Sequence, residues 1–225
     1  MKRIRGEFPD DLPEETLYAL AELFDEDFLR DRGLPAQPGE LLRWFHEALV
    51  QMSEDVYPDI PRDELTVAEA HALDEGGMKL AADDLGAADP LARTAADYAA
   101  LLATSMGTAE TAALLGVNAS RIRQRLTSSP PTLYGIRTSD GSWRIPAFQF
   151  AGGALLPGMK EVAARLHPEI HPIAVYRWFT ANDPELVIED DSAAPPELVG
   201  RSLSPRGWLL NGLPVDKIAG LAANL

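Results

Sequence analysis

The side chains with the most specific chemistry lie in the middle of the chain, between residues 118 and 126. An arginine can donate two hydrogen bonds to guanine, and a glutamine can pair similarly with adenine, so both can read base edges in the major groove of DNA. In a helix over this segment, Ile122 and Leu126 share one face, which we expect to point into the core. The outer face then carries the polar residues Ser120, Arg121, Gln124 and Arg125. Arg123 is placed to reach a phosphate, and the pattern predicts a helix that reads DNA.

The preceding residues are suited to holding this helix in place. Thr108 can cap a first helix, and the small side chain of Ala112 lets the two helices approach closely. Gly116 allows the positive φ of a tight turn, and we expect Val117 to anchor that turn in the core. Asn118 can cap the second helix. The spacing predicts a helix-turn-helix, and the alternative is an ordinary helical hairpin with a solvated arginine face.

Two β-prone runs, residues 132–137 and 142–146, follow this segment and surround an Asp-Gly turn. They predict a β-hairpin directly after the reading helix. Such a hairpin forms a wing, and Arg137 and Arg144 would bring positive charge to the DNA backbone.

Together these residues resemble the winged helix-turn-helix of the excisionase and MerR-like group. The pattern of that group is roughly Thr-x-x-Glu-Ala-Ala-x-x-Leu-Gly-Val-Ser, followed by a wing that ends in Trp-Arg-Ile-Pro. Here Thr111 stands where Glu is common and Asn118 stands where Ser is usual, and the wing ends in Trp143 to Pro146. The resemblance covers about 40 of the 225 residues and implies a DNA-binding role for them.

The charge distribution agrees with a local DNA-binding segment. The formal net charge is −15, but residues 101–150 hold 5 Lys and Arg against 2 Asp and Glu. Residues 1–100 hold 9 against 24, and residues 151–225 hold 6 against 9. A basic segment can bind phosphates while an acidic body limits non-specific binding.

Apolar residues at helical spacing and capping signals predict a mainly α-helical protein. Helices are expected near residues 12–31, 40–52, 66–80 and 90–105, then near 157–166, 173–181 and from 214 onward. We therefore expect an acidic helical region over residues 1–105, a winged helix-turn-helix over 106–150 and a small helical region over 151–225.

The C-terminal region contains large apolar side chains in short elements, and these either bind a partner or fill a small core. They are Trp178, Phe179, Trp208, Leu209 and Leu210. Residues 203–214 are similar to the Trp-Leu element of the toxin-binding domain in Xre/ParS-type antitoxins, and the whole chain resembles long DNA-binding antitoxins, including VapB-like proteins. The resemblance implies a cognate toxin as partner and repression of its own operon, with operator DNA bound by a homodimer. The alternative is a transcription regulator without a toxin partner.

The sequence offers little for catalysis. Cysteine is absent, and His167 and His171, four residues apart, are each followed by proline, which disfavours a metal site on one continuous helix. No phosphate-binding loop, nucleophile elbow or dinucleotide fingerprint is present. We expect no enzyme activity, no metal and no cofactor. Without an apolar run of about 20 residues, a cytoplasmic protein that does not span a membrane is expected.

Overall fold

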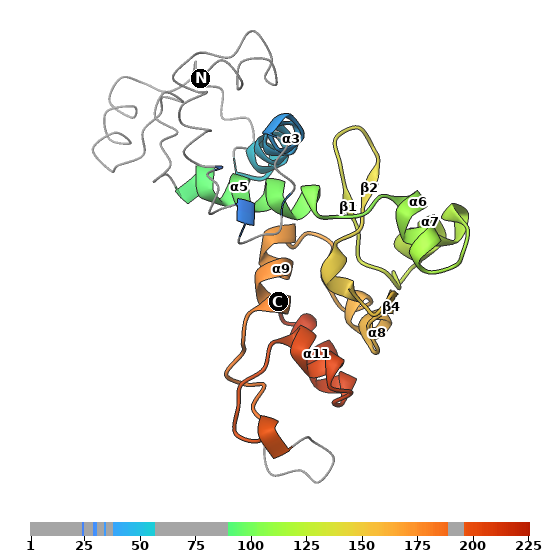
Figure 1. Cartoon of the computed structure of the whole chain (residues 1–225), viewed down its shortest axis with the longest axis vertical. Coiled ribbons are helices and arrows are strands. Elements are labelled where there is room, and N and C mark those ends of the chain that lie inside the picture. Colours follow the sequence, from blue (N-terminus) through green and yellow to red (C-terminus); the bar gives the residue numbers. More distant parts are fainter. Residues whose placement is uncertain (1–23, 25–28, 31–33, 35–37, 57–89, 189–195) are drawn as a thin grey trace. The chain divides into compact units, whose positions relative to one another are not determined.

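The computed structural model describes residues 24, 29–30, 34, 38–56, 90–188 and 196–225 (Figure 1). The chain divides into two compact units, residues 1–103 and 104–225. The described part is mainly helical, as predicted, and contains two small antiparallel hairpins. The expected helix over 66–80 lies outside the described residues, as does most of the one over 12–31. No helix among the described residues is long and apolar enough to cross a membrane.

The first unit contains helices α3 (Pro38–Val56) and α5 (Pro90–Ala103), which pack against each other. Both helices were predicted, with slightly different ends. Trp44 and Ala48 on α3 are buried, and Tyr98 on α5 is completely buried. The Tyr98 hydroxyl donates a hydrogen bond to the Gln51 side chain, so the polar end of this core residue is satisfied within the helix pair.

The second unit contains a longer series of short elements. In chain order they are α6 (Thr108–Leu114), α7 (Ala119–Thr127), β1 (Ile136–Arg137), β2 (Trp143–Arg144), the 3-10 helix η2 (Ala147–Gln149), β3 (Phe150–Ala151), β4 (Ala154–Leu155), α8 (Met159–Ala163), α9 (Pro172–Thr180), the 3-10 helix η3 (Pro196–Leu198), α10 (Pro205–Leu210) and α11 (Val215–Ala222).

Helices α6 and α7 are joined by a tight turn that contains Gly116 with φ of +63°. The Gly116 N–H donates to Ala113 O at 3.3 Å, and the Val117 N–H donates to Ala112 O at 3.0 Å, which is the pairing of a Schellman motif. Gly116 has the predicted role. The prediction that Val117 anchors the turn in the core is wrong, because its side chain is 40% exposed. Leu115 packs against the core instead.

Both helices have defined N-terminal caps. Helix α6 is capped by Gly107, whose N–H donates to the Glu110 carboxylate at 2.7 Å. Thr108 is already the first helical residue, so the prediction that it caps α6 is wrong. The predicted cap of α7 is confirmed, since Asn118 Oδ1 accepts the Arg121 N–H at 2.8 Å.

The first hairpin lies where the sequence predicts it, with shorter strands. Ile136 pairs with Arg144, and Arg137 with Trp143. Outside the hairpin, Met106 just before α6 pairs with Ile145 through two backbone hydrogen bonds of 2.9 and 2.7 Å. The hairpin is therefore joined directly to the start of the two-helix segment.

One core cluster lies beneath the two helices and both hairpins. It consists of Ala112, Ile122, Leu126, Leu133, Ile145 and Phe150, with Trp143 and Leu155 packed against it. The second hairpin, β3–β4, turns at Gly152 and Gly153, both with positive φ. The predicted domain boundary between residues 150 and 151 falls inside β3, so the structure differs from the predicted division there.

Gln149 connects the loop before β1 to η2. The buried amide of Gln149 accepts the Tyr134 N–H at 2.8 Å and donates to Tyr134 O at 2.7 Å. Burial raises the pKa of the Tyr134 phenol above its ordinary value.

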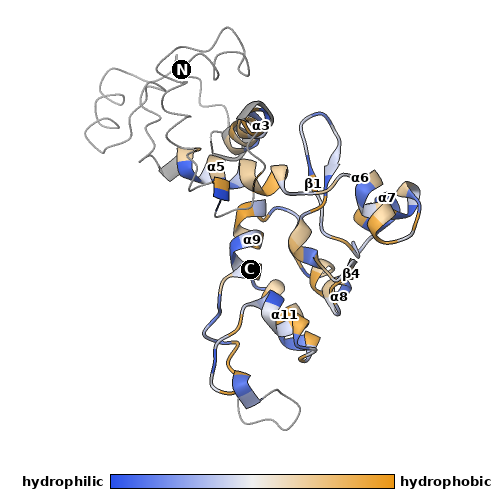
Figure 2. Cartoon of the chain, viewed as in Figure 1, coloured by the Kyte–Doolittle hydropathy of each residue, from blue (hydrophilic) through white to orange (hydrophobic). Residues whose placement is uncertain are grey.

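The C-terminal elements form the remainder of this unit's core. Its buried side chains are Phe148, Met159, Val162, Ile173, Val175, Phe179, Trp208, Leu209 and Ile218. Figure 2 shows hydrophobic and hydrophilic residues on α11, as expected of a helix with one buried side. Arg206 on α10 donates to Phe148 O at 3.1 Å and to Phe150 O at 3.2 Å, so it joins α10 to η2 and β3.

Candidate nucleic-acid interface

The exposed side of α7 carries most of the predicted reading residues. Ile122 and Leu126 are buried, as predicted, and fix the orientation of the helix. The side chains left exposed are Asn118, Ser120, Arg121, Arg123 and Gln124. Ser120 and Gln124 are each two residues from Ile122, so they lie about 160° around the helix from it and form its outermost edge. This edge has the dimensions and chemistry needed to enter a major groove.

The arginines of α7 lie on different flanks of that edge. Arg121 donates from Nη1 to Gln124 Oε1 at 2.7 Å, which orients both side chains. Arg125 is half-buried and its Nη2 donates to Thr132 O at 3.5 Å. Burial, and then the charge of Arg121, lower the pKa of Arg125 from its ordinary value. Arg121 and Arg123 lie about 100° from Ile122 in opposite directions around the helix. Both flanks of the edge are therefore cationic.

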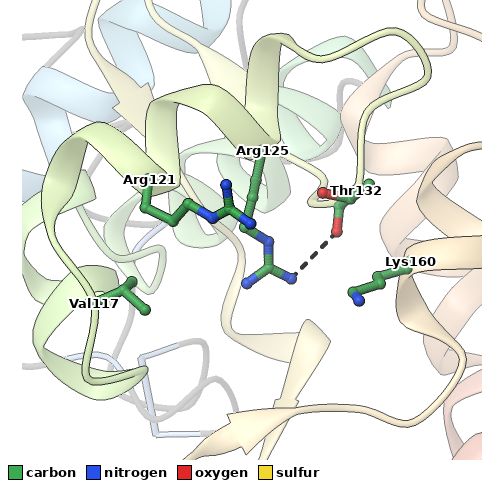
Figure 3. A pocket seen from close by; sticks show the side chains of 5 residues that line it. All are labelled: Val117, Arg121, Arg125, Thr132 and Lys160. Carbon is green, nitrogen blue, oxygen red and sulfur yellow. Dashed lines mark hydrogen bonds between the residues drawn. The ribbon is translucent and has the colours of Figure 1, made fainter.

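Arg121 and Arg125 line a hollow of about 270 Å³ that sequence reasoning missed. Its other lining residues are Val117, Thr132 and Lys160, the last from α8 (Figure 3). Lys160 lies 33 residues after Thr127, the last residue of α7, and no local pattern in the sequence indicates that it lies near the arginines. Only the packing of α8 within the same unit brings it there.

The first hairpin presents its two arginines differently. Arg137 is exposed and its guanidinium lies 5.7 Å from the centre of the Trp143 ring, within the range of a cation–π contact. Arg144 is half-buried. The Asp140 carboxylate accepts from Thr138 Oγ1 at 2.6 Å and from the Ser142 N–H at 2.9 Å, so this negative charge is engaged within the turn.

The segment around these elements is depleted of acidic residues. Between Glu110 and Glu161 the only acidic residue is Asp140, in a protein with a net charge of −15. The same segment contains the basic residues Arg121, Arg123, Arg125, Arg137, Arg144 and Lys160. All the residues predicted to contact DNA lie in this segment, and the structure places them in α7, at its N-cap Asn118 and in the first hairpin.

The residues predicted to bind a protein partner are mostly in the core. Phe179, Trp208 and Leu209 are at most 6% exposed, and the Trp208 indole N–H donates to Pro214 O at 2.9 Å. Their apolar surface is used within the unit and is not offered to a partner. Trp178 is half-buried, and Leu210 is 45% exposed. Of the five predicted residues, Leu210 alone is exposed.

The two histidines considered for metal binding have separate surroundings. His171 caps α9 by accepting the Ile173 N–H at Nδ1, 3.2 Å away, and exposed His167 lies 3.9 Å from the Glu169 carboxylate. Within the described ranges, no three His, Asp or Glu residues gather in a way that could hold a metal ion.

Comparison with protein families, with curated proteins and with solved structures finds no match for this chain. The interpretation of the interface therefore rests on its own geometry and charge.

Proposed function

We propose that residues 104–155 form a winged helix-turn-helix and that the protein is a sequence-specific DNA-binding regulator. In this proposal α7 is the recognition helix and β1–β2 is the wing. The observation that carries the proposal is the exposed side of α7, where Ser120, Arg121 and Gln124 form a polar surface without a carboxylate. The capped turn and the buried Ile122 and Leu126 support it, because they hold that surface in one orientation.

In this proposal, the chemistry of each side chain decides whether it contacts a base or a phosphate. Gln124 and Ser120, at the outermost edge, are assigned to base edges, and Arg121 on the flank orients Gln124 through its hydrogen bond to the Gln124 amide. Arg123 and the wing residue Arg137 are assigned to phosphates, which position the protein without reading sequence. Two copies of a single helix-turn-helix bind half-sites about 10 base pairs apart. We therefore expect a homodimer on a palindromic operator.

The proposal is tested by selecting duplexes from a random-sequence library with the full chain. A consensus of two half-sites should be enriched. Gln124→Ala should then weaken binding to the consensus by about 1–3 kcal/mol and relax preference at one position of each half-site. Asn224→Ala, which removes an exposed amide on the last turn of the chain, is the matched control and should bind normally. Selection that enriches no sequence would overturn the proposal.

The narrower antitoxin function rests on the resemblance of residues 203–214 and of the overall chain. It is tested separately, by co-expressing the protein with the product of each adjacent reading frame. Rescue of growth from one toxic neighbour supports it. If the product of every adjacent reading frame is harmless, the antitoxin function is rejected, and the alternative is a transcription regulator without a toxin partner.

A further inference from the structure

The hollow beside α7 gathers three cationic side chains from two separate helices. Arg121 and Arg125 come from α7 and Lys160 comes from α8, and Figure 3 shows their charged ends extending toward the same space. Val117 and Thr132 complete the lining, and none of its described residues carries a carboxylate. Within the described part of the chain, these three cations make no ion pair.

Among the described residues, no carboxylate compensates this positive charge. Their hydrogen-bond acceptors are neutral, namely Gln124 Oε1 for Arg121 and Thr132 O for Arg125. Partial burial of Arg125, and then repulsion by the charge of Arg121, disfavour the cationic form of Arg125 and lower the pKa of Arg125. An anion placed between the three groups would relieve this repulsion, because it would replace cation–cation contacts by charge-assisted hydrogen bonds.

The size and geometry of the hollow select the kind of anion. At about 270 Å³ it is slightly smaller than the roughly 300–1,000 Å³ of sites for drug-sized ligands, and so it suits one compact group. A guanidinium donates two parallel hydrogen bonds to phosphate oxygens, whereas an ammonium supplies a point charge. Arg125 is already oriented for this by its hydrogen bond to Thr132 O.

We propose that this hollow binds a phosphate group, held by Arg121 and Arg125 of α7 together with Lys160 of α8. The source favoured by its position is the DNA backbone next to the major groove that α7 would enter, and this assignment rests on the proposed function. The other source with the same chemistry is a free phosphate or a phosphorylated small molecule. Lys160 thereby extends the DNA-binding surface beyond the helix-turn-helix and the wing.

The first measurement is the salt dependence of binding to a random-sequence 20-base-pair duplex. Each phosphate contact contributes about 0.9 to the slope of log affinity against log salt concentration. Lys160→Ala should lower the magnitude of this slope by about that amount. Lys217→Ala removes the same charge from α11, where Lys217 lies over Trp208, and should leave the slope unchanged. Equal slopes for wild type and Lys160→Ala would overturn the inference while the proposed function stands.

The second measurement uses inorganic phosphate alone and follows the side-chain Nε–H signals of the arginines by NMR. Arg121 and Arg125 should show a saturable shift, while Arg206, which is held by two carbonyls, should not. Lys160→Ala should weaken this binding about threefold to tenfold. If the protein binds no duplex, the proposed function fails, and saturable phosphate binding at the two arginines then assigns the site to a free ligand. If the protein shows no duplex binding and no shift at these arginines, the proposed function and this inference are both overturned.

Discussion

Gln149 shows how one buried side chain substitutes for secondary structure. Its amide pairs with both backbone groups of Tyr134, 15 residues away, and also donates to Pro146 O at 3.3 Å. The side chain itself is completely buried. Since buried backbone groups must be paired, this amide fixes the path of the chain between α7 and the first hairpin.

Gln149→Leu should destabilise the protein by about 2–4 kcal/mol, because it leaves the N–H and C=O of Tyr134 buried without this partner. Denaturant unfolding followed by circular dichroism measures the loss. Asn211→Ala, which removes an exposed amide bonded to Gly207 O, should cost less than about 1 kcal/mol. Similar losses for both variants would mean that burial at Gln149 is not what makes its amide important.

Two glycines with left-handed φ allow backbone strain to be separated from crowding. A Cβ at Gly116 would meet nothing within 4 Å, so Gly116→Ala should cost about 1–2 kcal/mol from its positive φ alone. A Cβ at Gly158 would lie 2.5 Å from Val215 Cγ2, at the start of α11. Gly158→Ala should therefore cost a further 1–3 kcal/mol or so.

The same unfolding assay checks the difference between these two variants. Val215→Ala combined with Gly158→Ala should recover part of the additional loss, because the crowded methyl group is removed. If Gly116→Ala is as damaging as Gly158→Ala, then φ alone dominates at both sites.

At the scale of elements, the orientation of α7 depends on its cap. Asn118→Ala should cost about 1 kcal/mol of stability, because the Arg121 N–H loses its side-chain acceptor. Asn118→Asp keeps an equivalent acceptor and should stay within about 0.5 kcal/mol of wild type. Its added negative charge should nevertheless weaken duplex binding, because Asn118 is exposed next to the proposed DNA-facing edge.

Measuring stability and DNA affinity on the same two variants distinguishes the roles of this residue. Unchanged affinity for Asn118→Asp would place the DNA contact away from the start of α7. It would also count against the proposed recognition helix.

The features of the interface that the sequence predicted correctly are local ones. Gly116, Asn118 and the Asp140–Gly141 turn act within a few residues of themselves, so their types and spacing are sufficient to predict a turn, a cap and a hairpin. One error nearby is also instructive. Gly107 displaces Thr108 as the cap because Glu110 reaches back to its N–H, and a glycine without a side chain gives no strong capping signal.

The features that sequence reasoning missed depend on contacts between distant segments. Lys160 in the hollow and the Arg206 bonds to Phe148 O and Phe150 O follow from packing of the C-terminal helices. The same packing buries Phe179 and Trp208, which the sequence alone could assign equally to a core or to a partner surface. The helical pattern of this region was predictable, but the partners of its side chains were not.

At the scale of the whole molecule, charge is divided between the two units. Residues 1–103 hold 9 Lys and Arg against 24 Asp and Glu, whereas residues 104–225 hold 11 of each. The entire net charge of −15 therefore belongs to the first unit. Under the proposed function, we expect an acidic unit on the same chain to lower the affinity for DNA through long-range repulsion, an effect that salt screens.

A fragment of residues 104–225 should bind a random-sequence duplex more tightly than the full chain at low salt. Because the Debye length falls to about 10 Å at 0.1 M salt, the difference should shrink as salt rises. Fluorescence anisotropy with a labelled duplex measures both, and a thermal melt of the fragment first verifies cooperative folding. A difference that does not depend on salt would indicate that the first unit acts by contact and not by charge.

The pairing of Met106 with Ile145 brings the two ends of a 40-residue stretch to adjacent positions. Chain ends that lie close together favour insertion and grafting, but this segment also packs against Phe150 and pairs with Gln149, so an exchanged segment must keep those contacts. The helices, the turn and the first hairpin all lie inside this loop. Under the proposed function, one contiguous replacement between these two residues that keeps the contacts to Gln149 and Phe150 should transfer a different DNA specificity to the rest of the chain.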